Sequence, residues 1–374
     1  MSSAEKIRAV WPELPEPAVW ADHLAQSHAR NWHTNYGPVN AQFEERLLAD
    51  YGRSDECVVT ACNATSALSA CLISEGIRGP VLCPAFTFQA TAGAILGANC
   101  TPLIVDVDPV TGAVPAHVMQ AALTETGARA AMLISPYGIA TDFTEHACVC
   151  ADMGVLLIID NAAGLGIDRS DPRMGASGPH VREVYSLHAT KPFGIGEGGA
   201  IFAPAEAETR LRSAMNFGQL THTRDGAEAR PLWGINGKMS EVAAAVGLAV
   251  ADSMRQRVMA RQSMARRWRN ALDQVSVPHF CTEPARSPWQ CFPILLQSEA
   301  SVLELESAAD ARGIELRRYY APSLGDCGGM PRYGDCAVAH DLCRRAIVLP
   351  VRSFMPEDAQ DALIADVIGC LPNE

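Results

Sequence analysis

Short apolar runs alternate with stretches of helical periodicity between residues 40 and 202. The runs are short and rich in β-branched residues, whereas the stretches between them repeat apolar positions every three to four residues. The pattern predicts strands at 57–61, 81–83, 103–107, 131–135, 155–160, 184–187 and 199–202, and helices at 65–75, 88–96 and 141–153. Such alternation is typical of an α/β fold whose mostly parallel sheet is covered by helices on both faces.

A second pattern begins near residue 240. Residues 239–272 predict one long or kinked helix, and the segments at 290–296, 308–313, 316–320 and 356–371 predict a smaller α/β unit. The first residues are punctuated by Pro and Trp, which indicates an arm with a short helix. We therefore expect three parts: an N-terminal arm (1–35), a large domain (36–250) and a small C-terminal domain (251–374).

Composition places the chain among ordinary folded proteins. It has 374 residues, of which 48% are hydrophobic and 19% charged, and its formal net charge is -12. An acidic balance argues against general nucleic-acid binding. The 13 cysteines include no C-x-x-C pair, so we expect reduced buried thiols and no metal site. No secretory signal or membrane-length apolar run is visible, and we expect a soluble cytoplasmic protein.

One lysine has an unusual setting. Lys191 lies between the apolar run at 184–187 and the glycines at 194, 196, 198 and 199. A lysine that is partly removed from water can lose its proton and form a Schiff base with a carbonyl, and pyridoxal phosphate is the usual aldehyde. Such a site also needs a phosphate cradle, a carboxylate for the pyridinium nitrogen and an aromatic side chain on the ring.

Each requirement has a candidate, and each candidate also has an ordinary structural interpretation. Residues 63–66 open a helix directly after a strand, where backbone amides can bind phosphate or simply be capped. Asp160 ends an apolar strand, a position where α/β sheets bind ligands and where capping carboxylates also occur. Phe88 can cover a ring or fill the core. Ser186 and His188 can serve the site or the fold, and the glycines can serve a hairpin.

The order of the segments is more specific than any one of them. The informative stretches are NATSAL (63–68), PAFTFQATAGAI (84–95), PLIVDVDP (102–109), YG (137–138), IDNAAGLG (159–166), SLHATK (186–191), GEGGAI (196–201), GINGKMSEVAAAVGL (234–248), GIELRRYYAP (313–322) and LP (349–350). In this order the chain resembles the nucleotide-sugar aminotransferases of the DegT/StrS type. These are pyridoxal-phosphate enzymes with the aspartate aminotransferase fold, fold type I. The resemblance extends over nearly the whole chain from about residue 36.

The resemblance implies a role for each matching residue. Lys191 would bind the cofactor covalently and shuttle protons, Asp160 would keep the pyridinium nitrogen protonated, and Phe88 would stack on the ring. Phosphate contacts would come from Ala64, Thr65 and Ser186, and from Asn236 to the cofactor of the neighbouring subunit in a homodimer. Four further residues would contact the substrate: His188, Arg317, Tyr319 and Tyr320.

Some positions differ from the usual family pattern. Ala64 replaces a common glycine, and Ala163 replaces a glutamine that commonly contacts the phenolic oxygen of the cofactor. Asn161 is a possible substitute donor, although strand alternation points it away from Asp160. Lys238 stands where arginine is common, and Ser135-Pro136 stand where a His-Leu pair is common. These differences concern the sugar and the amino donor more than the cofactor.

The resemblance implies transfer of an amino group from glutamate, or glutamine, to a keto group of a nucleotide-linked sugar, for polysaccharide or secondary-metabolite biosynthesis. The nucleotide would need local cations, and Lys238, Arg317, Arg318 and Arg332 are candidates. Two alternatives are a pyridoxal-phosphate sugar dehydratase and a non-catalytic regulator that binds the cofactor. Related dehydratases carry histidine in place of the lysine, so Lys191 favours transamination.

Overall fold

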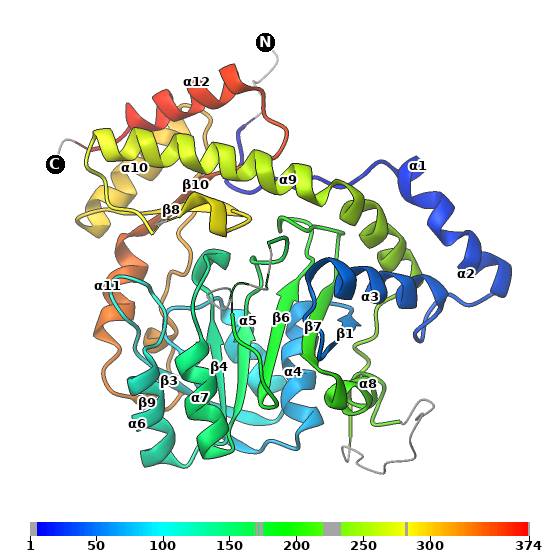
Figure 1. The fold of residues 1–374 in the computed structure, drawn as a ribbon. Coiled ribbons are helices and arrows are strands. Elements are labelled where there is room, and N and C mark those ends of the chain that lie inside the picture. The colour runs from blue at the N-terminus through cyan, green and yellow to red at the C-terminus, as the bar shows by residue number, and fades with distance from the viewer. Residues whose placement is uncertain are drawn as a thin grey trace.

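An eight-stranded sheet forms the centre of the molecule (Figure 1). The computed structural model describes residues 6–167, 169, 171, 175–219, 233–280 and 283–372. In spatial order the strands are β1 (Glu56–Ala61), β7 (Gly199–Pro204), β6 (Val181–Ser186), β5 (Leu156–Asp160), β4 (Ala130–Ile134), β2 (Gly79–Pro84), β3 (Cys100–Val105) and β9 (Arg332–Tyr333). β7 runs opposite to the other seven strands, which are all parallel to one another. The prediction of an α/β fold with a mostly parallel sheet is therefore confirmed.

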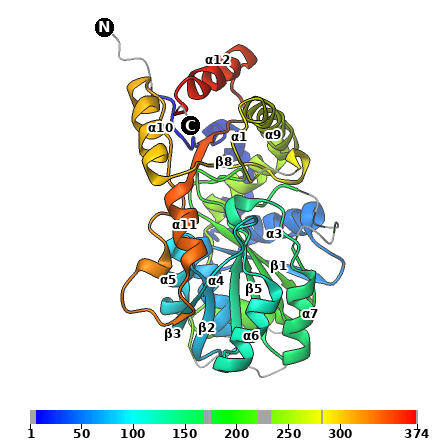
Figure 2. The ribbon, with the colours of Figure 1, turned by 90° about the vertical axis from the view of Figure 1, so that its left-hand side faces the viewer.

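Helices cover both faces of this sheet, as the unbroken apolar strands require. Figure 2 shows α4 and α5 on one side of the sheet and α6 and α7 on the other. The elements packed around the sheet are α3 (Pro38–Tyr51), α4 (Ala64–Ser74), α5 (Gln89–Gly97), α6 (Ala116–Thr126), η2 (Pro136–Gly138), α7 (Thr144–Met153), η3 (Ala205–Ala207) and α8 (Glu208–Met215). The central strands β4, β5 and β6 are buried along their whole length.

A smaller unit lies beyond the carboxyl ends of the strands. It contains η4 (Pro284–Arg286), α10 (Glu299–Ala311), α12 (Glu357–Ile368) and the antiparallel pair of β8 (Cys291–Leu295) and β10 (Ala346–Pro350). Its core gathers Trp268, Phe292 and Leu349. The helix α9 (Glu241–Gln274) runs through 34 residues without a break, and its first half packs against α3. The sequence left a long and a kinked helix open, and the structure has one unbroken helix that changes direction along its length (Figure 1).

Two segments do not fit a simple division into consecutive domains. The N-terminal elements α1 (Pro17–Trp20), η1 (Ala21–Leu24) and α2 (Ala25–Arg30) form a helical arm, and α1 and η1 pack on α9. After α10 the chain returns to the large sheet through η5 (Leu324–Asp326), β9 and α11 (Ala337–Arg345), where β9 pairs with β3. Because α9 crosses residue 250 and β9 joins the large sheet, the three-part division remains a proposal.

The segment at 316–320, which the sequence assigns to the smaller unit, forms no strand. It makes a single bridge, between Arg317 and Val348, and its last tyrosine packs on Phe86 and Tyr137. The strand that pairs with β8 is β10, which the sequence pattern did not single out. Among the described helices, none has the length and apolar character needed to cross a membrane.

Candidate active site

A cavity of about 690 Å³ opens at the carboxyl ends of the parallel strands. Loops after β1, β2, β4, β5 and β6 supply one side, and the other side is closed by Gln290, Cys291, Arg317, Tyr319 and Tyr320. This is the edge where open α/β sheets bind ligands. The cavity brings together ten of the predicted site residues: Ala64, Thr65, Phe88, Asp160, Ser186, His188, Lys191, Arg317, Tyr319 and Tyr320.

Asp160 lies at the end of β5 with one carboxylate oxygen paired and one not. The Thr91 hydroxyl donates to Oδ2 at 2.8 Å, and Thr91 is itself bonded to Thr87 at 2.7 Å. Among the described residues, Oδ1 has no hydrogen-bond partner although it is buried. Burial raises the pKa of the carboxyl, while the Thr91 bond and the Lys191 charge oppose that shift. A protonated ring nitrogen at Oδ1 would satisfy the free oxygen and stabilise the carboxylate.

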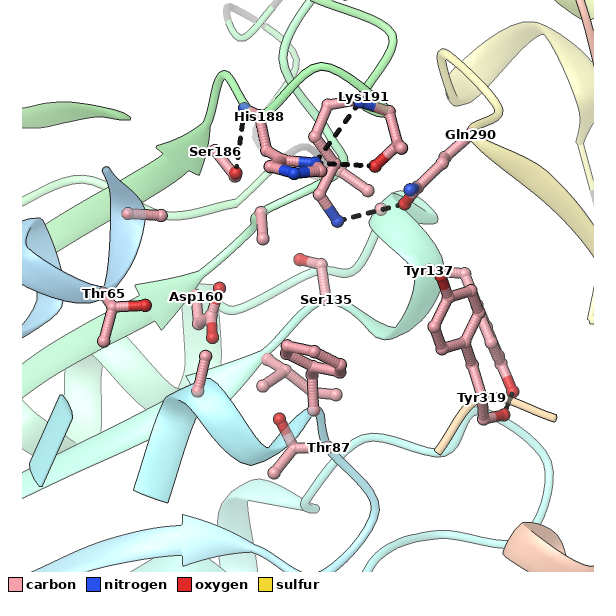
Figure 3. Close-up of a pocket in the computed structure, with 18 of the residues that line it drawn as sticks. Thr65, Thr87, Ser135, Tyr137, Asp160, Ser186, His188, Lys191, Gln290 and Tyr319 are labelled. Carbon is pink, nitrogen blue, oxygen red and sulfur yellow. Dashed lines mark hydrogen bonds between the residues drawn. The ribbon is translucent and has the colours of Figure 1, made fainter. Parts of the chain in front are cut away.

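Lys191 faces this carboxylate from the loop after β6 (Figure 3). Its Nζ donates to Oε1 of Gln290 at 3.1 Å. Burial lowers the pKa of the amine, and the charge of Asp160 opposes the shift. Burial therefore makes the neutral amine, which is the form that attacks an aldehyde, more accessible than it is for a lysine in water.

The start of α4 has the features of the phosphate cradle that the sequence predicts. Asn63 accepts a hydrogen bond from the Ser66 amide at 2.8 Å, so it is an N-cap, as one interpretation of the sequence held. The amides of Ala64 and Thr65 in the same first turn have no acceptor within the helix. They line the cavity together with the Ser186 hydroxyl, so a phosphate can accept from them at the positive end of the helix.

Gly199 lets β7 approach this helix start closely. A methyl group at Gly199 would lie 2.8 Å from the Ala64 nitrogen and 2.8 Å from the Asn63 carbonyl carbon. Both neighbours are backbone atoms, so they cannot move aside without displacing the first turn of α4. One of the glycines behind the lysine thus shapes the phosphate cradle and not merely a hairpin.

We predict that Gly199→Ala weakens cofactor binding by about tenfold or more, which corresponds to about 1.4 kcal/mol. Absorbance titration with pyridoxal phosphate measures the Kd. The matched control is Gly93→Ala on α5, where an added methyl group meets no atom within 4 Å. A folded Gly199→Ala protein with the wild-type Kd would show that this cradle does not hold the phosphate.

Phe88 is placed to cover a flat ligand. Its side chain is 56% exposed although it lines the cavity, and its ring meets Tyr319 edge-on at 6.5 Å. Phe86, two positions earlier, is fully buried in the core. Of the two roles that the sequence left open for Phe88, filling the core is taken by Phe86, and Phe88 faces the ligand space.

Three of the predicted substrate residues, Arg317, Tyr319 and Tyr320, form one wall of the cavity, whereas His188 lies across from them in the loop after β6. Tyr320 stacks on Tyr137 with ring centroids 5.2 Å apart, and its hydroxyl accepts from the Tyr137 amide at 3.0 Å. The Tyr137 hydroxyl donates to the Tyr319 carbonyl at 2.7 Å, and Arg317 donates to the Tyr319 hydroxyl at 3.3 Å. His188 is bonded to Thr190 at 2.9 Å. This wall is fixed by its own contacts, and its substrate role stays a prediction.

The other candidates lie outside this cavity. Asn236 is exposed, and its Oδ1 accepts from Lys238 at 2.7 Å. The placement is compatible with a contact to a neighbouring subunit, which stays a prediction. Arg318 is paired with Glu299, and Arg332 donates to the Gly325 carbonyl, so neither lines the pocket.

Sequence reasoning missed several residues of the site. Thr87 and Thr91 follow helical spacing in the PAFTFQAT stretch, which is a signal that was available. Gln290 carried no signal, because it approaches from the smaller unit. Ala163 lines the cavity with no donor, and Asn161 turns away and donates to Glu183 at 3.0 Å, as strand alternation predicted.

Pyridoxal phosphate fits these groups. Its aldehyde suits the neutral amine, its ring nitrogen suits the orphaned oxygen of Asp160, and its phosphate suits the start of α4. The fold and the site define a pyridoxal-phosphate enzyme of fold type I. More narrowly, the chain belongs to the DegT/DnrJ/EryC1/StrS aminotransferase family, whose model matches residues 20–368.

Several relatives support this assignment. The chain is 31% identical to protein Rv3402c of Mycobacterium tuberculosis, covering 98% of this chain and 90% of that protein. It is 27% identical to dTDP-4-amino-4,6-dideoxy-D-glucose transaminase of Shigella dysenteriae, and the match covers 95% of this chain and 96% of that protein. The crystal structure of DesI in the presence of its TDP-sugar product matches with a TM-score of 0.85 at 27% identity, covering 99% of this chain and 94% of that one.

Proposed function

We propose that this enzyme transfers the amino group of glutamate, or of glutamine, to a keto group of a nucleotide-linked sugar in the cytoplasm. The observation that carries the proposal is the presence of the Lys191 amine and the Asp160 carboxylate in one cavity, where each feels the charge of the other. A site with both groups can move protons at a carbon attached to nitrogen. Lys191 stands where related sugar dehydratases carry histidine, which argues for transamination.

The residues divide the work in a simple way. When bound, pyridoxal phosphate supplies an electron sink for the bond that breaks at the substrate carbon. Lys191 would take the proton from that carbon and deliver it to the cofactor carbon on the other side of the nitrogen. Asp160 holds a proton on the ring nitrogen through charge and a hydrogen bond. The amides of Ala64 and Thr65 fix the phosphate so that the ring stays in register with the lysine.

The nature of the acceptor is supported by relatives whose names refer to different nucleotide sugars. Besides the dTDP-sugar transaminase, they include UDP-2-acetamido-2-deoxy-3-oxo-D-glucuronate aminotransferase of Pseudomonas aeruginosa and GDP-perosamine synthase of Caulobacter vibrioides. A diphosphate needs cationic donors, and Arg317 lines the cavity beside Tyr319. The cavity is large enough for the cofactor ring and a sugar together.

We further propose a homodimer that shares its sites. Asn236 and Lys238 do not line their own cavity, and two large apolar side chains close to them, Phe217 and Val242, are 55% and 49% exposed. Lys238 lies 4.5 Å from the centre of the Phe217 ring. A second subunit would cover these apolar side chains and receive the Asn236 amide at its cofactor phosphate.

The test is an acceptor screen with the purified holoenzyme. Glutamate carrying heavy nitrogen is supplied with dTDP-, UDP- or GDP-linked keto sugars, and the sugar products are weighed by mass spectrometry. We expect heavy nitrogen in one nucleotide-linked amino sugar, and glutamine tested in parallel identifies the donor. If keto acids accept the nitrogen efficiently while no nucleotide-linked sugar does, the sugar assignment is wrong.

A further inference from the structure

The amine of Lys191 is held by a residue of the smaller unit. Gln290 is 6% exposed, and its Oε1 accepts from Lys191 Nζ at 3.1 Å. Figure 3 shows the tip of the Lys191 side chain meeting the Gln290 amide, with Ser135 and Asp160 below them in the view. A buried amide oxygen in hydrogen-bond range of the reacting nitrogen is a specific contact, because Gln290 could otherwise have turned to solvent.

A buried arginine fixes the backbone that carries Gln290. Arg261 of α9 donates to the Trp289 carbonyl at 2.9 Å, directly before Gln290. The same guanidinium donates to Val351 and Ser353 and forms an ion pair with Glu13 at 2.8 Å. The Trp289 indole donates in turn to the Pro284 carbonyl at 2.7 Å, and the ring is 1% exposed. The amide of Gln290 is therefore presented by a rigid segment.

We propose that Gln290 is a positioning residue that orients the free amine of Lys191 and tunes its basicity. The inference deepens the proposed function and rests on the role of Lys191 in it. Whenever the lysine is not bonded to the cofactor, its neutral nitrogen carries two hydrogens and one lone pair, and their directions must be fixed. An acceptor on one side directs an N–H bond toward Gln290, which leaves the nitrogen lone pair to face the substrate carbon.

The direction of the tuning follows from charge. A carbonyl oxygen binds an ammonium more strongly than a neutral amine, so Gln290 favours the protonated lysine. Asp160 from β5 acts in the same direction, and burial opposes both. The neighbouring thiol of Cys291 stays protonated, because burial raises its pKa to about 12. The remaining charged or titratable groups that line the cavity are His188, Glu197, Arg317 and the three tyrosines of the wall.

Two substitutions separate positioning from packing. Gln290→Met keeps the length and removes the acceptor, so the pKa of Lys191 falls by about one unit. Gln290→Glu keeps the acceptor and adds a charge, so that pKa rises by about one unit or more. A purely structural role would move both variants in the same direction or leave the pKa unchanged.

The pKa is measured on the full-length protein freed of cofactor, without any substrate. The rate of Lys191 acetylation by acetic anhydride is followed against pH by mass spectrometry. The chain contains only three lysines, Lys6, Lys191 and Lys238, so each label is assigned without ambiguity and Lys6 serves as the internal standard. Because no sugar or donor is present, the result does not depend on the acceptor screen.

Opposite shifts in the two variants support the proposal. Equal shifts, shifts in the same direction, or no shift in proteins that melt like wild type overturn it. In the reconstituted enzyme, Gln290→Met should lower kcat by about tenfold and change KM by less than about twofold. The matched control is Gln120→Met on the exposed side of α6, which should leave the labelling curve and kcat at the wild-type values.

Discussion

Lys191→Ala is expected to lower the rate of amino transfer by about 10⁴-fold, the largest effect of any single substitution in this protein. The Lys191 amine is the only lysine among the residues that line the cavity, so no other amine can form the bond to the cofactor or carry the proton. The measurement is kcat/KM with glutamate and the acceptor sugar identified in the screen. Lys191→Arg should be equally impaired, because a guanidinium stays protonated and cannot act as base or nucleophile.

The matched control for the lysine is Lys6→Ala. Lys6 is exposed, is paired with Asp310 and does not line the cavity. Its removal should leave kcat/KM within about twofold, as for an ordinary surface pair. Substantial turnover in Lys191→Ala, at a tenth of the wild-type rate or more, would show that the chemistry runs through another group.

Asp160→Asn is expected to lower kcat/KM by about 10²–10³-fold, or roughly 3–4 kcal/mol, while the protein still takes up cofactor. The amide has nearly the same shape as the carboxylate but no charge to hold a proton on the ring nitrogen. The phosphate cradle and Lys191 are untouched, so the Kd for the cofactor should rise much less than kcat falls. Steady-state kinetics and an absorbance titration give the two numbers.

Asp252→Asn is the control for this carboxylate. Asp252 is exposed and pairs with Arg46 at 2.8 Å on the outer side of α9. Wild-type kinetics are expected for it. An Asp160→Asn enzyme with kcat/KM within about threefold of wild type would contradict the assigned role. The negative charge at the unpaired Oδ1 would then not be needed for the reaction.

Much of the fold could be predicted from local pattern. The strand that ends in Asp160 is apolar on both faces, and only a central strand of a parallel sheet accommodates that. The start of α4 was visible because a polar Asn precedes a helical run. In contrast, residues 316–320 were assigned to the smaller unit, yet Tyr320 packs into an aromatic group with Phe86 and Tyr137 of the large one. Local pattern carries no information on such long-range side-chain packing.

The site divides in the same way. Lys191, Asp160 and the helix start lie in segments whose order along the chain carries information, so a resemblance could identify them. Gln290 lies 99 positions from Lys191 in the sequence and directly before β8 in the smaller unit. Periodicity contains no information on such contacts. The unpaired Oδ1 of Asp160 is likewise a property of the folded cavity. Sequence could name the reacting groups, and the structure was needed to find what holds them.

The visible spectrum of the purified protein, before and after addition of glutamate, tests the central claim most directly. Wild type loaded with pyridoxal phosphate should be yellow from its bond to Lys191, and glutamate should bleach that band as the amino group moves to the cofactor. Lys191→Ala loaded in the same way should lack the lysine-dependent band. A wild-type protein that takes up no cofactor, or whose band responds to neither glutamate nor glutamine, would contradict this account.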